Sequence, residues 1–437
     1  MKKQALMAAA LAAVMMTTGV QASSLTEVTQ MTGEYDWVDG TNLLKGLTDT
    51  GYALSTVDGT MLTEGKFYSS MEYRDGFITA FDATVEDTNA CGGVLDLEGQ
   101  TVVDFVYGDI DIKSDKWIAA VKLEDATADK YDYKAFIGDG YWLITGVDIY
   151  YVGEEGSQKI AELTRDEYAQ SNAIGDYIFI ESRADGTVTA YDRTFAVVGE
   201  NLSSVYDDYG LDFEINEDEY VIYSYNGQQG IQDTEGNIIV EAAYYTVRDI
   251  DEGYAVVYDG EHEGLIDLEG NLIVPMEYDD ILYDYYPPTG QSKYVSAGYI
   301  CVVKDGMIGY YDVDGDVTME PSYAKDALEY HGASCTYTDM QNNVHILAAD
   351  GTDTTLPAEN SEIRSLDYAG GVYYYFYNEN YDYGLIDWKG EVLVPATNNS
   401  VGMSGDGRYV LVEEEDYETY DLYEVSYPLD EAGDMTV

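Results

Sequence analysis

The chain has 437 residues, of which 84 are Asp or Glu and only 21 are Lys or Arg, so its formal net charge at pH 7 is −63. Such a charge repels nucleic acids and anionic lipid surfaces, which excludes both as partners and leaves cations, basic peptides, proteins and neutral glycans. Hydrophobic residues make up 46% of the chain, including 45 Tyr, and this content excludes a wholly disordered protein. An alternative interpretation of the charge is that it keeps an extended β surface soluble.

Residues 1–22 have the features of a secretory signal peptide. Lys2 and Lys3 form a basic start, an apolar run extends from Ala5 to Met16, and small residues around Ala22 suit cleavage before Ser23. The apolar run is shorter than the roughly 20 residues that a membrane-spanning helix needs. We therefore expect export from a bacterial cell to the extracellular space, with no membrane span; an N-terminal core helix is the alternative.

A short phrase, Gly-x-x-Asp-x-x-Gly followed by an apolar run, recurs along the mature chain. The clearest copies begin at Gly93, Gly230, Gly264, Gly309 and Gly384. Weaker copies lie at Tyr52–Gly59, Tyr150–Gly156, Val188–Asp192, His345–Gly351 and Tyr420–Tyr423. About nine or ten units of roughly 35–45 residues then fill residues 23–437, most degenerate at 125–225, and leave no room for a separate conventional domain.

Each unit is predicted to contain three or four short antiparallel strands. In the clearest unit, Gly253–Tyr258 reads as a half-buried strand, Gly264–Asp267 as a second strand and Asn271–Val274 as a third. The Asp-x-x-Gly element suits a turn in which Asp accepts a backbone N–H and Gly adopts the left-handed conformation. These aspartates are therefore interpreted as structural. Helical spacing is weak throughout, and residues 160–170 are its best candidate.

The segment from Gly264 to Asp279 resembles the WG-containing repeat (KWG repeat) of secreted and surface proteins of bacteria. The units at Gly230, Gly309 and Gly384 carry the same resemblance. The resemblance implies a β-rich repeat array, propeller-like in arrangement, that mediates interactions outside the cell and performs no chemistry. A propeller blade of four antiparallel strands fits the unit length, so we predict an all-β, β-propeller-like fold. Because nine or ten blades exceed the usual number, an open β superhelix or two smaller propellers are the alternatives.

Few residues suggest a metal site. Asp312, Asp314 and Asp316 alternate around a glycine, loosely like a calcium-binding loop, but the rest of an EF-hand is missing and the hairpin turn already explains the same span. The histidines, His262 and His345 among them, have no zinc spacing. Calcium at the three aspartates is thus a weak prediction, and no other cofactor is expected.

No catalytic signature is present. The chain lacks Gly-x-Ser-x-Gly, its cysteines lack a protease motif, and 84 carboxylates make any single acidic pair uninformative. We therefore predict no catalytic residues and no enzyme. The alternative is an exported glycan-acting hydrolase with its site in a break of the repeat, either Asp125–Ser171 or Tyr283–Pro288. Both segments are interpreted as loops.

Cysteines and aromatic residues complete the prediction. Either Cys301 and Cys335 form a disulfide between neighbouring units, or these two and Cys91 are buried thiols, which is the favoured interpretation. Tyrosines concentrate at 373–377, 283–286 and 417–427, and exposed ones provide rigid contact area for proteins or sugars, unless they belong to the core. The predicted function is a secreted, non-enzymatic repeat protein that binds protein, peptide or glycan; a calcium-stabilised surface scaffold is a further alternative.

Overall fold

A computed structural model of the chain shows an all-β protein. It describes residues 24–85, 91–125, 142–153, 155–205, 220–233, 236–251, 253–286, 291–356, 365–368, 373–378, 380–405 and 407–426. The predicted signal peptide lies outside these residues. Within them, the helical elements are two 3-10 turns, Arg165–Glu167 and Lys325–Ala327, and no helix is long and apolar enough to cross a membrane. The all-β prediction is confirmed.

The described strands form antiparallel sheets that follow one another along the chain. The first five sheets contain β2 (Tyr35–Trp37), β3 (Leu43–Thr48) and β4 (Gly51–Thr56); β5 (Glu72–Arg74), β6 (Phe77–Phe81), β7 (Gly92–Asp96) and β8 (Thr101–Tyr107); β9 (Asp109–Ile112), β10 (Trp117–Asp125), β11 (Trp142–Gly153) and β12 (Gly156–Thr164); β13 (Gln170–Ile174), β14 (Tyr177–Glu181), β15 (Val188–Asp192) and β16 (Val197–Leu202); and β17 (Tyr220–Tyr225), β18 (Gln228–Asp233) and β19 (Ile238–Tyr244). The next four contain β20 (Thr246–Asp251), β21 (Tyr254–Tyr258), β22 (Glu263–Asp267) and β23 (Leu272–Tyr278); β24 (Asp280–Ile281), β27 (Val295–Ser296), β28 (Tyr299–Lys304), β29 (Met307–Asp312) and β30 (Val317–Ala324); β31 (Glu329–His331), β32 (Ser334–Thr338), β33 (Val344–Ala348) and β34 (Asp353–Thr355); and β35 (Ser365–Tyr368), β36 (Tyr373–Tyr377), β37 (Tyr383–Asp387) and β38 (Val392–Asn398). A tenth sheet contains β39 (Ser400–Met403), β40 (Tyr409–Glu413), β41 (Thr419–Ser426) and β1 (Ser24–Thr32), and a separate hairpin pairs β25 (Asp284–Tyr286) with β26 (Gln291–Lys293).

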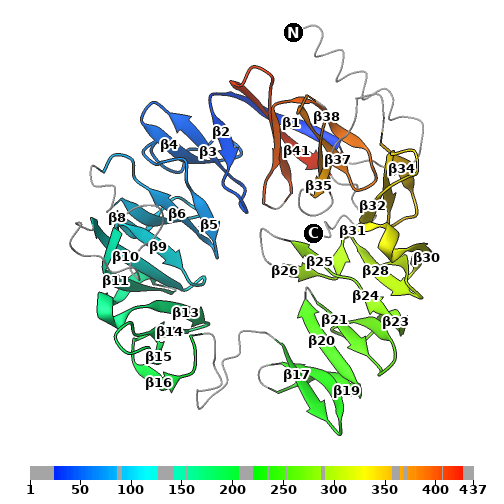
Figure 1. Cartoon of the computed structure of the whole chain (residues 1–437), viewed down its shortest axis with the longest axis horizontal. Helices are drawn as coiled ribbons and strands as arrows, with labels where there is room; N and C mark the ends of the chain where they lie inside the picture. Colours follow the sequence, from blue (N-terminus) through cyan, green and yellow to red (C-terminus); the bar gives the residue numbers. More distant parts are fainter. Residues whose placement is uncertain are drawn as a thin grey trace.

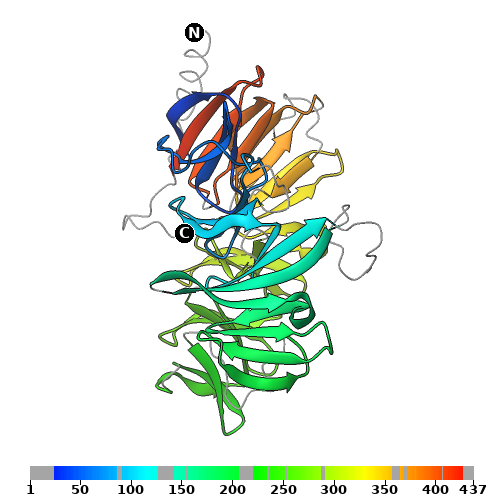
Figure 2. The same cartoon turned by 90° about the vertical axis from the view of Figure 1, so that its left-hand side faces the viewer.

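The ten sheets are arranged in a ring. In Figure 1 the first strand of a sheet, such as β5, β20 or β35, lies on the inner side of the ring, and the last, such as β8, β23 or β38, lies on the outer side. Figure 2 shows the same ring from its side, with the strands of β9 to β16 crossing its thickness. Because consecutive strands are antiparallel, the hairpins of each sheet lie alternately on the two faces of the ring.

Strands from both ends of the chain complete the tenth sheet. β1 is its outermost strand and pairs with β41 from Ser24 opposite Ser426 to Thr32 opposite Thr419. This pairing joins the N-terminal and C-terminal parts into one ring. The β-propeller-like prediction is therefore confirmed, whereas an open superhelix or two smaller propellers do not describe the arrangement in Figure 1.

The first glycine of the repeated phrase is required by a close backbone contact. In five sheets the register shifts where the last two strands pair, as in Leu265 opposite Val274 and then Ile266 opposite Leu272. A Cβ on Gly264 would lie 2.6 Å from the carbonyl oxygen of Val274, and the other four glycines face the equivalent carbonyl at 2.4–2.8 Å. Only a residue without a side chain permits this irregularity of the pairing.

The second half of the phrase forms the predicted turn. The Asp267 carboxylate accepts the N–H of Asn271 at 2.7 Å, the N–H of Gly270 donates to the Asp267 carbonyl at 3.1 Å, and Gly270 has φ +82°. Gly99, Gly236, Gly315 and Gly390 have φ between 77° and 86°. The structural interpretation of these aspartates is confirmed where the hydrogen bonds are present.

Both faces of a typical sheet are covered, which explains the apolar runs of the sequence. Leu265 and Ile266 are neighbours in β22 and point to opposite faces, yet both are fully buried. Leu265 packs with Ile300 and Val302 of the following sheet, and Ile266 packs with Ile231 of the preceding one. Each sheet therefore contributes to two layers of core, one on each side, as a repeat protein requires.

Two predictions about breaks in the repeat need correction. Residues 142–171 do not form a loop: β11 and β12 are long strands of a regular sheet, because alternate side chains such as Val147 and Ile149 are buried against their neighbours. The helix candidate at 160–170 contains the end of β12 and a single 3-10 turn. The segment after Tyr283 is a β-hairpin, β25–β26, inserted between β24 and β27, which both pair with β28.

Candidate binding surface

The three aspartates proposed as calcium ligands lie in a hairpin turn between β29 and β30. The Asp312 carboxylate accepts the N–H of Asp316 at 2.8 Å, and the N–H of Gly315 donates to the Asp312 carbonyl at 3.1 Å. Among the described residues, no group of three or more His, Cys, Asp or Glu side chains is placed to hold a metal ion. The turn explains Asp312 without a cation, and calcium at Asp312, Asp314 and Asp316 stays a prediction.

All three cysteines are buried thiols. Cys301 and Cys335 lie in the same core cluster, where the Tyr310 hydroxyl is 3.4 Å from the Cys335 sulfur and donates to the Gly332 carbonyl at 3.0 Å. Burial raises the pKa of the Cys335 thiol to about 11 and holds the pKa of Cys301 well above its usual value. Because the thiolate is the nucleophilic form, neither cysteine suits covalent catalysis. The interpretation as buried thiols is confirmed.

His345 has the most enzyme-like surroundings of the histidines. Its Nδ1 atom lies 2.9 Å from Asp353, its Nε2 atom lies 3.4 Å from Asp339, and its ring stacks on Tyr337 with centroids 4.5 Å apart. A general base needs one ring nitrogen free to accept the proton of a nucleophile. Since both nitrogens of His345 face carboxylates, the arrangement suits an ion-paired histidine.

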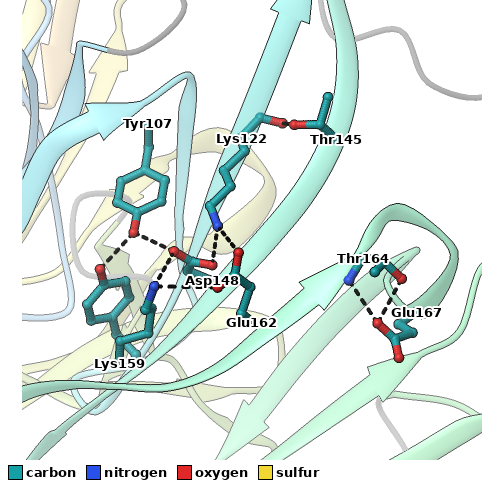
Figure 3. Close-up of polar contacts among 9 residues, drawn as sticks. Tyr107, Lys122, Thr145, Asp148, Lys159, Glu162, Thr164 and Glu167 are labelled. Carbon is teal, nitrogen blue, oxygen red and sulfur yellow. Dashed lines mark hydrogen bonds and ion pairs between the residues drawn. The ribbon is translucent and has the colours of Figure 1, made fainter.

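A buried carboxylate that sequence reasoning missed joins two sheets of the ring. Asp148 of β11 is only 1% exposed, and its oxygens lie 2.7 Å from the Lys122 ammonium and 3.1 Å from the Lys159 ammonium (Figure 3). The hydroxyl of Tyr107, from β8 of the preceding sheet, donates to Asp148 at 2.7 Å. Glu162 receives a further ion pair from Lys122 at 2.7 Å.

The charges of this cluster balance internally. Burial alone raises the pKa of Asp148, but the hydrogen bonds from Lys122, Tyr107 and Lys159 outweigh burial and hold the pKa below its usual value. Two ammonium groups face two carboxylates, so no charge is left for a ligand. The cluster is best explained as a link between the sheets of β8 and β11, and a sequence offers no signal for it, because its members are up to 55 positions apart.

The tyrosine-rich strand at 373–377 belongs mainly to the core. Tyr373, Tyr374 and Phe376 of β36 are buried between neighbouring sheets, whereas Tyr375 and Tyr377 are half-buried. The alternative that placed these rings in the core is thus confirmed for this strand. Exposed aromatic rings lie elsewhere, for example Tyr225, Tyr245 and Tyr283, and also at the turns that follow β36 and β40.

The turn between β36 and β37 presents Tyr381. The Asn378 side-chain oxygen accepts the N–H groups of Asn380 and Asp382, which fixes the turn. Tyr381 is 63% exposed and has φ +66°, and its ring stacks on Tyr377 with centroids 5.8 Å apart. The side chain therefore projects from the tip of the hairpin with one face in contact and the other in solvent.

The turn between β40 and β41 presents Tyr417 in the same way. The N–H of Tyr417 donates to the Glu414 carbonyl at 3.1 Å, and the Asp416 carboxylate accepts the N–H groups of Glu418 and Thr419. Tyr417 is 71% exposed and has φ +60°. Its ring contacts no other aromatic ring among the described residues.

The two turns lie on the same face of the ring and are connected by hydrogen bonds. Asn398, at the end of β38, donates from its side chain to the Tyr383 carbonyl at 3.3 Å. The next residue, Asn399, donates its backbone N–H to the Glu413 carbonyl at 3.0 Å and its side-chain N–H to the Glu414 carbonyl at 2.6 Å. We call residues 380–383 and 414–418 the tip surface.

Both tyrosines occupy a position at which the repeated phrase has glycine. The turn places this residue in the left-handed region, which is unfavourable for a bulky side chain, so a tyrosine there is unusual and core packing does not explain it, because both side chains are exposed. The sequence carried a signal for these residues, because Asn378-x-x-Tyr381 and Glu414-x-x-Tyr417 have the spacing of Asp-x-x-Gly. Of the two residues, Tyr417 lies within the tyrosine run predicted at 417–427, whereas Tyr381 lies outside all three predicted runs.

Comparisons with known proteins support the repeat family. Residues 230–261 and 264–286 match the family described as "WG containing repeat", so the resemblance is confirmed for the units that begin at Gly230 and Gly264. No curated protein matches the chain. Similar solved structures include a eukaryotic initiation factor (12% identity, TM-score 0.27, covering 74% of this chain and 86% of that chain) and Hsv2 of Kluyvelomyces marxianus (10% identity, TM-score 0.22, covering 66% and 92%).

Proposed function

We propose that this chain, which carries WG-containing repeats in a ring of small β sheets, is a secreted, non-enzymatic protein that binds a protein, peptide or glycan outside the cell. The observation that carries the proposal is the tip surface, where Tyr381 and Tyr417 are exposed on turns of two neighbouring sheets that lie on the same face of the ring. Tyrosine provides a large, rigid and amphipathic contact at low entropic cost, which is why it is frequent at binding surfaces.

The signal peptide predicted at residues 1–22 supports the extracellular location. Export through the general secretory route followed by cleavage near Ala22 would leave a mature chain of residues 23–437. N-terminal sequencing of protein collected from the culture medium of the producing cells tests this part of the proposal. We expect the sequence to begin at Ser23, and an intact N-terminus on protein retained inside the cells would contradict it.

A binding assay with a parallel turnover assay tests the proposed function. The mature chain, labelled and applied to arrays of peptides, secreted proteins and glycans, is expected to retain a subset of them. The same mixtures, incubated with the protein and analysed by mass spectrometry, are expected to come back unchanged. Turnover that disappears when a single residue is substituted would replace the proposal with an enzyme.

A further inference from the structure

We propose that the tip surface binds a cationic polypeptide segment, with the exposed faces of Tyr381 and Tyr417 receiving Lys or Arg side chains and the carboxylates around them pairing with further basic groups. The inference rests on the proposed function and names the partner class that this surface fits. It follows from three independent features of the two turns: their charge, their aromatic rings and their backbone conformation.

The first feature is the charge of the two turns. Residues 380–383 and 413–419 contain Asp382, Glu413, Glu414, Glu415, Asp416 and Glu418, and no Lys or Arg. Within the described part of the chain, none of the ion pairs involves these carboxylates. A cationic ligand is therefore attracted here without first displacing a Lys or Arg of the protein, although Glu413, Asp382 and Asp416 accept neutral hydrogen bonds.

The crowding of these carboxylates has a measurable consequence. Burial, together with the neighbouring carboxylates of Asp421 and Asp416, raises the pKa of Glu414 above its usual value. A lysine or arginine bound beside Glu414 would lower the pKa of Glu414, because a nearby positive charge favours the ionised carboxylate. Binding of a basic ligand and deprotonation of Glu414 are thus expected to support each other.

The second feature is the aromatic face that each tyrosine presents. An ammonium or guanidinium group placed over a tyrosine ring is attracted by the negative face of the ring, more strongly as water is excluded. The chain already contains such contacts, for example Lys304 over Tyr278 at 5.4 Å and Arg408 over Tyr409 at 5.8 Å. Tyr417 is free to make the same contact with a partner, and Tyr381 has one face free because Tyr377 covers the other.

The third feature is that the exposed tyrosines do not favour the fold. Glycine adopts a φ of about +60° without the steric cost that a side chain adds, and glycine occupies the equivalent place in the turns ending at Gly270 and Gly390. A tyrosine at this φ is kept at a cost to stability, which is typical of residues that contact a partner. Replacing Tyr417 by glycine should therefore remove binding while leaving the fold as stable or more stable.

A polypeptide is favoured over a glycan as the occupant. The density of carboxylates around both rings repels anionic polysaccharides. The hydroxyl of a neutral glycan can donate to a carboxylate, but a Lys or Arg side chain adds a positive charge to each such hydrogen bond and makes it stronger. A chain rich in Lys or Arg uses the rings and the carboxylates at once. Glycan binding at the tip surface is accordingly an outcome that would overturn the inference.

Charge-neutral substitutions distinguish binding by the tip surface from binding by the overall negative charge of the protein. The mature chain and its Y381G/Y417G double variant have the same net charge, so a difference between them reports the tyrosines alone. Both are titrated with a peptide of alternating Lys and Gly, with its Glu counterpart, and with a panel of neutral glycans, and binding is measured by calorimetry. We expect at least tenfold weaker binding of the Lys peptide to the double variant, no binding of the Glu peptide, and an equal or higher melting temperature.

Phe195 provides a matched control. It also has a left-handed conformation, with φ +62°, but it lies in the turn between β15 and β16, on the opposite face of the ring. Its ring stacks on Tyr191 with centroids 4.2 Å apart, so the aromatic side chain already has a partner within the protein. The F195G variant is expected to bind the Lys peptide with the affinity of the unsubstituted chain.

The possible results separate this inference from the proposed function. Equal binding of the Lys peptide to the chain and its double variant would assign binding to the overall charge and overturn the inference. Binding of array ligands or glycans without binding of the Lys peptide would overturn it too, while the proposed function would stand. A chain that binds none of the peptides, proteins or glycans would contradict the proposed function itself.

Discussion

The ring has two junctions of contrasting construction. At the tenth sheet, β1 pairs with β41 over eight residue pairs, and Leu411, Tyr420 and Leu422 pack against Trp37 and Leu44 of the first sheet. At the junction between β16 and β17, no core cluster of the described residues contains members of both sheets. At the junction of the chain ends, strand pairing and core packing occur together. At the β16–β17 junction, the described core residues of each sheet pack only with residues on their own side of the junction.

This difference shows how a repeat ring distributes its stability. Each sheet buries its faces against neighbours, so a junction contributes according to the side chains that cross it. The junction that joins the chain ends also has the closest backbone contact, because the N–H of Gly405 donates to the Thr41 carbonyl at 2.8 Å, and a Cβ on Gly405 would lie 2.3 Å from the carbonyl carbon of Gly40. We therefore expect substitutions there to cost far more than at the β16–β17 junction.

Removal of β1 should have the largest effect. A chain that begins at Gly33 loses the pairing with β41 and exposes the edge of that strand. At about 0.5–1 kcal/mol for each of the lost hydrogen bonds, the free energy of unfolding should fall by roughly 4–8 kcal/mol. Calorimetry should show a much lower melting temperature together with aggregation through the open edge. A melting temperature equal to that of the full mature chain would mean that the ends do not close the ring.

A pair of matched truncations measures the two junctions directly. L422A removes a fully buried side chain at the closing junction and should cost about 3 kcal/mol. I222A removes a 37% exposed side chain in β17 and should cost less than about 1 kcal/mol. Urea unfolding of both variants gives the comparison, and equal losses would show that the two junctions are equally packed.

Substitution of Asp148 tests a junction held by charge. D148N removes the buried carboxylate that Lys122, Lys159 and Tyr107 share, and should cost about 2–3 kcal/mol at pH 7, since the lysines are partly exposed and recover some hydration. The pKa of Asp148 is lowered in the folded protein, so its contribution is present above the unfolded pKa of about 4 and is lost as the pH falls below that value.

The measurement for Asp148 is unfolding as a function of pH. The unsubstituted chain should lose stability more steeply than D148N between about pH 4 and pH 2. K45M, which removes a lysine that pairs with an exposed carboxylate, is a suitable control and should change stability by less than about 1 kcal/mol. Parallel curves for the chain and D148N would show that the cluster is not coupled to folding.

A comparison of Asp387 with Asp267, in two copies of the repeated turn, gives the smallest predicted change in the free energy of unfolding. Here the substitution is expected to stabilise the protein. Asp387 is 1% exposed and burial raises its pKa to about 6, whereas the hydrogen bonds that Asn271 donates hold the pKa of Asp267 below its usual value. Glu391 stands where the other copy has Asn271 and cannot donate from its side chain. Asp387 therefore favours folding below about pH 4, and this contribution is lost as the pH rises through about 6.

Replacing Asp387 with asparagine keeps the oxygen that accepts the N–H groups of Lys389 and Glu391 and removes the buried charge. D387N should be more stable than the unsubstituted chain by about 2 kcal/mol at pH 8, and the gain should vanish near pH 4. D267N serves as the control and should not stabilise the protein at either pH. A stability difference for D387N that does not change with pH would show that the carboxylate is already neutral, or already solvated, across this range.

The repeated phrase made the architecture predictable, because an Asp-x-x-Gly turn and paired apolar residues such as Leu265 and Ile266 are local features. The role of the first glycine was not predictable, since the carbonyl of Val274 that approaches Gly264 lies on another strand. Closure of the ring was also beyond prediction: β1 contains no copy of the phrase, and its partner β41 is almost 400 residues away.

The candidate site was predictable only in part. The tyrosine runs at 373–377 and 417–427 pointed to aromatic contact area, but one consists mostly of core residues and the other contains Tyr417 at a turn. Whether a tyrosine is buried or exposed depends on whether its position faces a neighbouring sheet. That in turn depends on how the sheets pack around the ring. The Asp148 cluster depends on four strands from two sheets, so no local pattern precedes it.

Hydrogen exchange of the backbone amides of β1 tests the closure of the ring most directly. If β1 completes the tenth sheet, the amides of residues 24–32 that pair with β41 should exchange as slowly as those of β40, and more slowly than those of β17 at the other junction. Exchange of the β1 amides within seconds, alongside slow exchange in β40, would contradict a ring closed by the two ends of the chain.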